Sequence, residues 1–226
     1  MFAPVTATYF HGPVKTGKTA PALMTCVQAD GSEVKLVVKF AAGCEGGTGA
    51  LLREAVVAFM AADLDLPVPE SFLVKLEPDF VATIPDGDER YRLAKRNAAA
   101  SLGWNFGSTK LPPGFSTILK GQPIPQVLLP AAAEILALDT FIANPDRTVA
   151  NPNCQANGRS FAIYDHELAF RTEGLVFWKP PWEPGGITFP KAQPDLPATF
   201  SWTSCAAPSQ TSAALVALST SSPMPG

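Results

Sequence analysis

The fold of this chain is decided by the stretch ANPDRTVANPN at residues 143–153, which is followed by FAIYDHE at residues 161–167. The first stretch places Asp146 five residues before Asn151, in a loop that an Asn-Pro pair opens by breaking a predicted helix. The second stretch places Asp165 at the end of a short apolar run, which predicts a β-strand. We therefore expect two carboxylates and one amide to converge across a hairpin.

These three side chains have the chemistry of a phosphoryl-transfer site. Such a site requires one carboxylate at the attacking hydroxyl, and an amide oxygen and a second carboxylate on the metal. Asp146, Asn151 and Asp165 have the types, the order and the spacing for these tasks. The Asp-x4-Asn spacing also matches the catalytic loop of protein kinases. The pattern therefore indicates an enzyme that transfers phosphate from ATP.

Length and composition limit the class of protein. The 226 residues suffice for one domain with two lobes or for two small domains, and the net charge of −3 argues against a general nucleic-acid binder. The chain shows no basic leader with an apolar run, and no stretch of about 20 apolar residues. Its four cysteines form no C-x2-C pair. We expect a cytoplasmic protein with reduced thiols, away from membranes.

A glycine-containing segment follows the first predicted strand. Residues 12–19 read GPVKTGKT and fit the phosphate-binding pattern G-x4-G-K-T. That pattern requires a long helix directly after it, but the hairpin signal Asp30-Gly31 leaves no room for one. Three interpretations stay open: a turn that covers ATP phosphates, a plain loop, and a P-loop that uses Lys18 and Thr19.

Lys39 and Glu54 form a second candidate pair. Lys39 follows an apolar run in the strand predicted over residues 33–40, as in the kinase V-A-I-K pattern. Glu54 lies at the edge of the apolar stripe of a helix predicted over residues 50–63. There it can hold Lys39 toward nucleotide phosphates. The alternatives are a solvated strand-terminal lysine and a glutamate favoured only by the helix dipole.

The order of predicted elements suggests two lobes and a tail. Residues 1–100 are expected to form a sheet lobe with one main helix, and the polar stretch 77–97 to cross between lobes. Residues 101–205 are expected to form a second lobe, which contains a helix over residues 126–143 and the catalytic and metal-binding loops. Residues 206–226 are rich in Ser, Thr, Ala and Pro, which is typical of a weakly ordered tail.

Five segments in order resemble the HipA-like serine/threonine kinase domain, a compact relative of protein and lipid kinases. They are TGKTAP at 16–21, VVKF at 37–40, LPVPE at 66–70, NPDR at 144–147 with NPN at 151–153, and IYDHE at 163–167. The resemblance implies an α+β, two-lobed protein-kinase-like fold. It would have an antiparallel-sheet N-lobe with one main helix and a reduced, mostly helical or irregular C-lobe.

The resemblance also implies ATP and Mg2+ as cofactors and gives roles to five residues. Lys39 would bind the ATP phosphates, and Glu54 would orient it. Asp146 would accept the proton of the substrate hydroxyl. Asn151 and Asp165 would hold magnesium, and Asp165 would also count among the nucleotide-binding residues.

Further roles follow from the same resemblance. A turn formed by Gly17, Lys18 and Thr19 would cover the phosphates. Arg147 would brace the catalytic loop or meet a substrate phosphate. His166 would pin its loop by a hydrogen bond.

The acceptor and the partners stay open at this point. The acceptor could be a Ser or Thr of another protein, a residue of this chain or a small molecule, and an antitoxin-like protein partner is expected from the resemblance alone. Because the part after Asp165 is short, a catalytically inactive nucleotide-binding module that recruits a partner is the main alternative. A P-loop NTPase based on residues 12–19 is the less favoured one.

Overall fold

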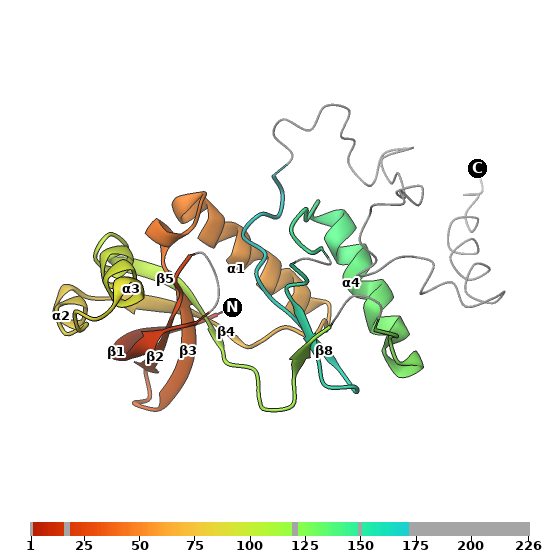
Figure 1. The fold of residues 1–226 in the computed structure, drawn as a ribbon, viewed down its shortest axis with the longest axis horizontal. Helices are drawn as coiled ribbons and strands as arrows, with labels where there is room; N and C mark the ends of the chain where they lie inside the picture. The colour runs from red at the N-terminus through yellow and green to blue at the C-terminus, as the bar shows by residue number, and fades with distance from the viewer. Residues whose placement is uncertain (1, 16–18, 119–121, 149–150, 172–226) are drawn as a thin grey trace, which may run out of the picture.

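The computed structural model describes residues 2–15, 19–118, 122–148 and 151–171. The first half of the chain contains a closed barrel of five strands in the order β1-β2-β3-β5-β4 (Figure 1). The strands are β1 (Ala3–Pro13), β2 (Ala22–Val27), β3 (Glu33–Lys39), β4 (Ser71–Leu76) and β5 (Gly103–Thr109). Neighbouring strands pair antiparallel, except that β1 and β4 pair in parallel and close the barrel.

The barrel forms because alternate strand residues are apolar and point inward. Leu36 and Val38 of β3 are fully buried there with Met24 and Val74. Closure leaves none of the five strands with an unpaired edge. The N-terminal antiparallel sheet that we expected is thus a barrel with one parallel pairing. Strand β5, which lies beyond the boundary predicted at residue 100, pairs with β3 and β4 in this barrel.

Residues 77–97 do not form the irregular crossing that we expected. They contain two helices that pack on the barrel, α2 (Pro78–Ala82) and α3 (Glu89–Ala99). The Asp88 carboxylate begins α3 by accepting a hydrogen bond from the N–H of Tyr91. The prediction was wrong because the polar outer faces of these short helices dominate the composition, while a few apolar residues suffice to pack them.

Helix α1 (Gly47–Asp63) occurs where a helix was predicted, after the 3-10 turn η1 (Ala41–Gly43). Its inward face differs from the predicted apolar stripe. Glu54 lies on the buried face with Val57 and is only 3% exposed, whereas Leu52 is 64% exposed. The helix therefore carries its glutamate into the protein interior instead of at the edge of the packed face.

The second part of the structure combines a small sheet with one helix. The sheet is antiparallel, in the order β6 (Ser116–Thr117), β7 (Cys154–Ala156), β8 (Phe161–Ile163). The predicted helix over residues 126–143 consists of a 3-10 turn, η2 (Gln126–Leu128), and α4 (Leu129–Phe141). Residues of α1, α4 and β8 share one core cluster, which includes Val57, Ile135 and Ile163. Helix α1 is thus common to both parts.

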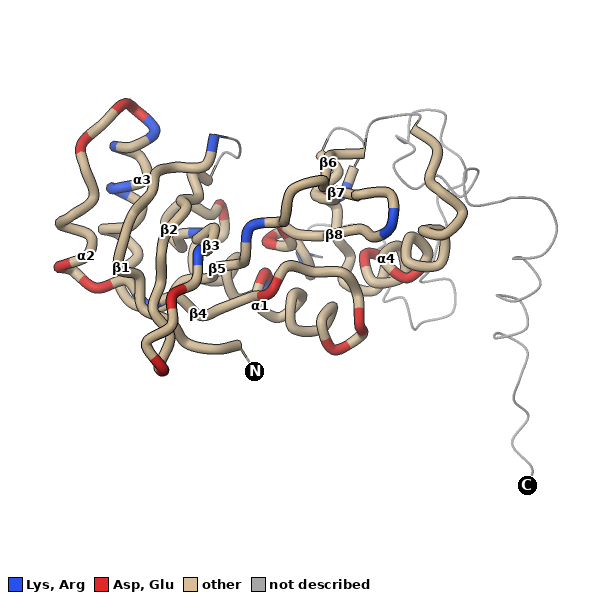
Figure 2. The backbone as a smooth tube through the Cα atoms, turned by 90° about the horizontal axis from the view of Figure 1, so that it is seen from below, with Lys and Arg blue, Asp and Glu red and all other residues tan. Residues whose placement is uncertain are grey.

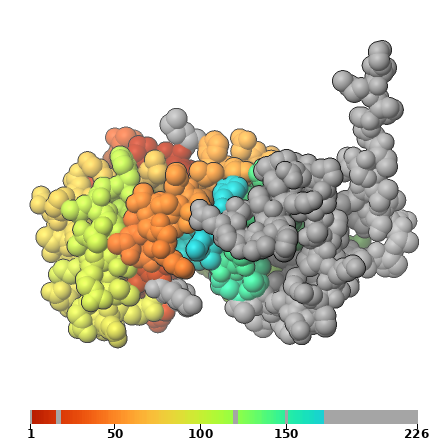
Figure 3. All heavy atoms as spheres, turned by 90° about the horizontal axis from the view of Figure 1, so that it is seen from above, coloured from red at the N-terminus to blue at the C-terminus, as the bar shows by residue number. Residues whose placement is uncertain are grey.

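The two parts lie side by side and are joined by the segment between β5 and β6 (Figure 2). Atoms of the segment that follows β8, in cyan, lie against those of α1, in orange (Figure 3). The architecture is therefore mixed α+β, as predicted at that level. The last part of the predicted second lobe and the whole predicted tail lie outside the described residues.

Two features bear on the expected class of protein. Among the described helices, none combines the length and the apolar character that crossing a bilayer requires. Cys26, Cys44 and Cys154 are buried and free of disulfide bonds in the described part of the chain. Cys205 lies outside the described residues.

Candidate active site

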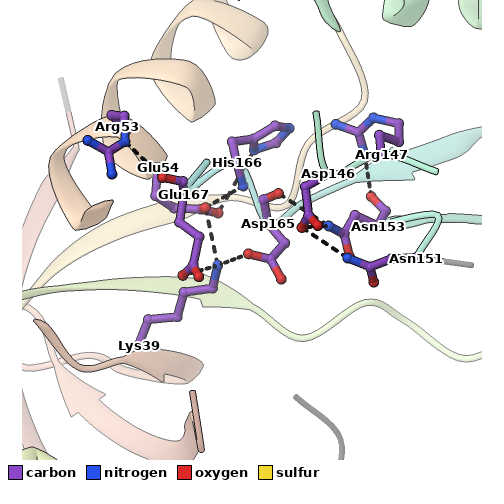
Figure 4. A network of polar contacts seen from close by, with 10 residues as sticks. All are labelled: Lys39, Arg53, Glu54, Asp146, Arg147, Asn151, Asn153, Asp165, His166 and Glu167. Carbon is purple, nitrogen blue, oxygen red and sulfur yellow. Dashed lines mark hydrogen bonds and ion pairs between the residues drawn. The ribbon is translucent and has the colours of Figure 1, made fainter. Parts of the chain in front are cut away.

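Lys39 ends β3 with its ammonium group among three carboxylates (Figure 4). Its Nζ lies 2.6 Å from Asp165 Oδ1, 3.1 Å from Glu54 Oε2 and 3.8 Å from Glu167 Oε2. The side chain of Lys39 is 13% exposed and that of Glu54 is 4% exposed. Because solvent screens this cluster less than it screens a surface ion pair, its charges interact strongly.

The protonation states within this cluster follow from burial and from neighbouring charges. Burial disfavours the charged form of Lys39, but Glu54 and Asp165 together hold its pKa above the ordinary value. Burial raises the pKa of Glu167, and the Lys39 ammonium offsets only part of that shift. Lys39 is therefore firmly cationic, while Glu167 takes up a proton more readily than an exposed glutamate does.

Backbone geometry places Asp165 opposite the barrel. The strand β8 is held to the segment after α1 by the N–H of Ile163, which donates to the carbonyl oxygen of Pro67 at 2.8 Å. Asp165 then adopts a φ of +63°, a left-handed conformation that Asp tolerates better than most residues. The next backbone N–H, that of His166, donates to Glu54 Oε2. The backbone just after Asp165 is thus bound to Glu54, on the buried face of α1.

Asp146 lies in the loop after α4 and accepts two amide donors on one oxygen. The Nδ2 atoms of Asn151 and Asn153 lie 2.9 Å and 2.8 Å from Asp146 Oδ2. The backbone N–H of Asp146 donates to Asn144 Oδ1 at 3.1 Å. The loop therefore holds Asp146 from both its backbone and its side chain, and Asp146 itself is half-buried.

Arg147 braces this loop from inside. Its Nε donates to Asp139 Oδ2 at 2.6 Å, and its side chain is only 1% exposed. Its Nη1 donates to the carbonyl oxygen of Asn153. Of the two roles that the resemblance allowed for Arg147, this buried geometry favours the brace, because a guanidinium group so enclosed does not meet a phosphate in the cavity.

His166 is fully buried and neutral. Burial and the nearby Arg147 lower its pKa from 6.5 to about 3. Neither ring nitrogen has a hydrogen-bond partner among the described residues. The expected pinning of the loop does occur, but it uses the backbone N–H of His166 and the Glu54 carboxylate rather than the imidazole.

A cavity of about 820 Å³ lies between the barrel and the second part. This volume falls within the range of small-molecule and cofactor sites, roughly 300–1,000 Å³. The cavity is lined by Lys39, Glu54, Asn151, Asn153 and Asp165, by Val14, Thr19 and Val37 of the barrel side, by Leu111, Pro112 and Phe115 of the linking segment, and by Gln155 and Tyr164 among others. Asp146 does not line it, although both of its amide partners do.

The segment around residues 12–19 does not form a P-loop site. Thr19 lines the cavity, and Gly17 and Lys18 lie outside the described residues. A P-loop requires a helix after Thr19, but the chain continues into strand β2 (Ala22–Val27). The structure therefore contradicts the alternative of a P-loop NTPase. The residues that would have to form its helix instead form β2, which pairs with β1 and β3.

The donor set fits magnesium bound together with phosphates. In the described part of the chain, no group of three or more His, Cys, Asp or Glu side chains could hold a metal alone. Mg2+ is commonly held by one or two protein carboxylates plus substrate phosphates and water. Asp165 supplies such a carboxylate, 35% exposed. The Oδ1 atoms of Asn151 and Asn153 accept no hydrogen bond from described residues.

Two residues of this site had no predicted role. Glu167 comes two positions after Asp165, and no known motif predicts a role at that spacing. The Glu167 carboxylate reaches Lys39 because the chain turns at Asp165. Asn153 was part of the NPN segment, but spacing alone favoured Asn151. The only sequence signal for Asn153 was that a second amide follows so closely.

Comparison with known proteins supplies one result about ancestry. The sequence model of the family described as HipA-like kinase matches residues 9–175 of this chain. No curated protein and no solved structure matches this chain.

Proposed function

The chain belongs to the HipA-like kinase family, and on that premise we propose that it is an ATP-dependent phosphotransferase. It transfers the γ-phosphate of Mg2+-bound ATP to a hydroxyl group, that of a Ser or Thr in a protein or in this chain itself. The barrel with α1 acts as the nucleotide-covering lobe of a two-lobed kinase-like arrangement. The part with α4 and β6–β8 acts as the lobe that carries the loops.

The observation that carries this proposal is the position of Lys39. Its ammonium group contacts Glu54 on one side and Asp165 on the other, at the wall of a cavity large enough for a nucleotide. A kinase requires a lysine at the phosphates, a glutamate that orients the lysine and an aspartate on the metal. Lys39, Glu54 and Asp165 fill these three roles.

The phosphate-bearing end of ATP would be held by charge and by the metal. Lys39 would bind the phosphates, and the segment that contains Thr19, which lines the cavity, would cover them. The carboxylate of Asp165 and the amide oxygen of Asn151 would hold Mg2+. When bound, this ion neutralises the phosphate charge and orients the γ-phosphate.

Asp146 would act on the acceptor. As the acceptor oxygen forms its bond to the γ-phosphorus, the bond from that phosphorus to the bridging oxygen of ADP breaks. The hydroxyl proton passes to the Asp146 carboxylate, whose orientation the amides of Asn151 and Asn153 already hold. ADP then leaves with the negative charge of the bridging oxygen.

Mass spectrometry after incubation with Mg2+ and ATP tests this proposal. The wild type is expected either to gain at least one phosphate group or to phosphorylate an added protein. Asp146→Asn, which keeps the shape of the side chain, should abolish transfer while leaving the melting temperature nearly unchanged. Asp63→Asn, at the exposed end of α1, is the matched control and should transfer normally.

One observation favours a second candidate, a nucleotide-binding module without transfer. Asp146 does not line the cavity, and one of its oxygens is occupied by two amide donors. For such a module, ATP with Mg2+ would raise the melting temperature, and Asp165→Asn would abolish that increase. No phosphate would appear on the chain or on added protein. An antitoxin-like protein partner, proposed from the family resemblance, would then be recruited by the nucleotide-bound chain.

A further inference from the structure

Asn153 occupies an unusual position between the two functional loops. It is 6% exposed and has a φ of +42°, in the left-handed region that Asn and Gly adopt most easily. Its carbonyl oxygen accepts hydrogen bonds from Arg147 Nη1 and from the backbone N–H of Tyr164. Its backbone thus joins the Asp146 loop to the end of β8.

The side chain of Asn153 makes the same connection. Its Nδ2 donates to Asp146 Oδ2 at 2.8 Å, and the same atom lies 3.5 Å from the carbonyl oxygen of Asp165. Asn151 donates to the same Oδ2 from the exposed side. The other oxygen, Asp146 Oδ1, accepts no hydrogen bond from described residues, and the two amides therefore distinguish the two oxygens of one carboxylate.

We propose that Asn153 is a positioning residue that fixes Asp146 Oδ2, leaves Oδ1 for the acceptor hydroxyl, and keeps the Asp146 loop in register with Asp165. This inference rests on the proposed phosphotransferase function. It assigns to Asn153 a task that Asn151 cannot perform, because within the described part of the chain the amide of Asn153 contacts both loops and that of Asn151 contacts only Asp146. Asn151 is left to turn its amide oxygen to the metal.

The left-handed conformation of Asn153 provides clean variants. Asn153→Gly can keep that backbone conformation and removes the CH2–CONH2 side chain with its amide. Asn153→Asp keeps size and conformation but sets a carboxylate against Asp146, where a donor is required. Asp65→Gly is the matched control, since Asp65 is exposed, has a φ of +56° and lies outside the site.

Rates and nucleotide affinity are measured on the full chain with Mg2+ and ATP. Asn153→Gly should lower kcat about 10- to 100-fold, the value of a hydrogen bond to a charged group, with the KM for ATP nearly unchanged. Asn153→Asp should be slower than Asn153→Gly, and Asp65→Gly should equal the wild type. A residue that served folding alone would change the melting temperature instead. A wild-type rate in Asn153→Gly, or in Asn153→Asp, would overturn the inference while leaving the proposed function intact.

Hydrogen exchange decides the inference independently of activity. The amide of His166, which donates to Glu54, should exchange at least about tenfold faster in Asn153→Gly, because the Asp165 loop loses its side-chain tie to the Asp146 loop and keeps only the hydrogen bonds to the Asn153 carbonyl oxygen. Exchange in the barrel strands should not change. Equal His166 exchange in variant and wild type would disprove the tie. If the wild type transfers no phosphate, the proposed function fails, and this measurement alone decides whether Asn153 joins the loops.

Discussion

The Nζ atom of Lys39 lies 2.6 Å from Oδ1 of Asp165, although the two residues are 126 positions apart in the chain. Lys39 comes from the barrel and Asp165 from the turn after β8, so this contact joins the two parts of the structure. It places a cation and a carboxylate side by side at the cavity wall. Its partners Glu54 and Glu167 make the pair part of a larger charge cluster, whose properties can be tested.

Replacing Lys39 by Met should destabilise the folded chain. The change leaves three carboxylates close together without their cation, and breaking a buried pair by removing one partner costs about 3–5 kcal/mol. Because the site is partly hydrated, we expect a smaller loss here: the free energy of unfolding in urea should fall by at least about half of that cost. Lys39→Arg keeps the charge and should lose much less. Equal stability of Lys39→Met and wild type would show that the cluster contributes nothing.

Glu167→Gln should stabilise the protein at neutral pH. Since burial raises the folded-state pKa of Glu167 above 4.5, the folded chain resists losing that proton, and stability falls as pH rises through the folded-state pKa. The substitution removes this loss. Thermal unfolding should therefore show a higher melting temperature for Glu167→Gln near pH 7, and no difference below pH 4.5. A lower melting temperature at pH 7 would mean that the ion pair with Lys39 outweighs burial.

His166→Phe should flatten the acid limb of the stability profile. The folded-state pKa of His166 is about 3 against 6.5 in the unfolded chain, so the unfolded chain takes up a proton first and stability is lost as pH falls from 6.5 toward 3. Above pH 6.5 this contribution is fully present. Calorimetry across this range should show a shallower decline for His166→Phe.

Arg147 and Asp139 should behave as a coupled pair. Arg147→Ala removes the partner of the Asp139 carboxylate, whose side chain is 11% exposed, and should cost about 3 kcal/mol. Asp139→Asn should remove much of that cost when combined with Arg147→Ala, because the unpaired charge is then gone. A double-mutant cycle in urea measures the coupling. Strictly additive losses of stability in the two single variants and the double variant would contradict the proposed bracing of the loop by Arg147 through Asp139.

Local patterns predicted a large part of this structure. An apolar run located the strand that ends at Lys39, and helical periodicity located the helix that carries Glu54. The Asn-Pro pair correctly ended α4 shortly before Asp146. The hairpin signal at Asp30-Gly31 correctly excluded the helix that a P-loop requires. All of these features depend on neighbours within a few residues, which the sequence displays directly.

The burial pattern of α1 was less predictable. The sequence showed that Leu52 and Glu54 belong to one helix, but Glu54 is buried rather than at the edge of the packed face, and Leu52 is exposed. A helix in contact with two cores is not governed by its own periodicity alone. The barrel on one side and α4 on the other determine which of its faces is covered.

The sequence by itself determined the local elements, their order and the residue types around the candidate site. Only the tertiary structure decided that β1 and β4 close a barrel, that Glu167 joins the Lys39 cluster, and that Asn153 ties Asp146 to the Asp165 loop. The physical reason is that strand closure and side-chain convergence join residues far apart along the chain. Their free energy comes from burial and charge pairing across that separation, which no window of neighbouring residues contains.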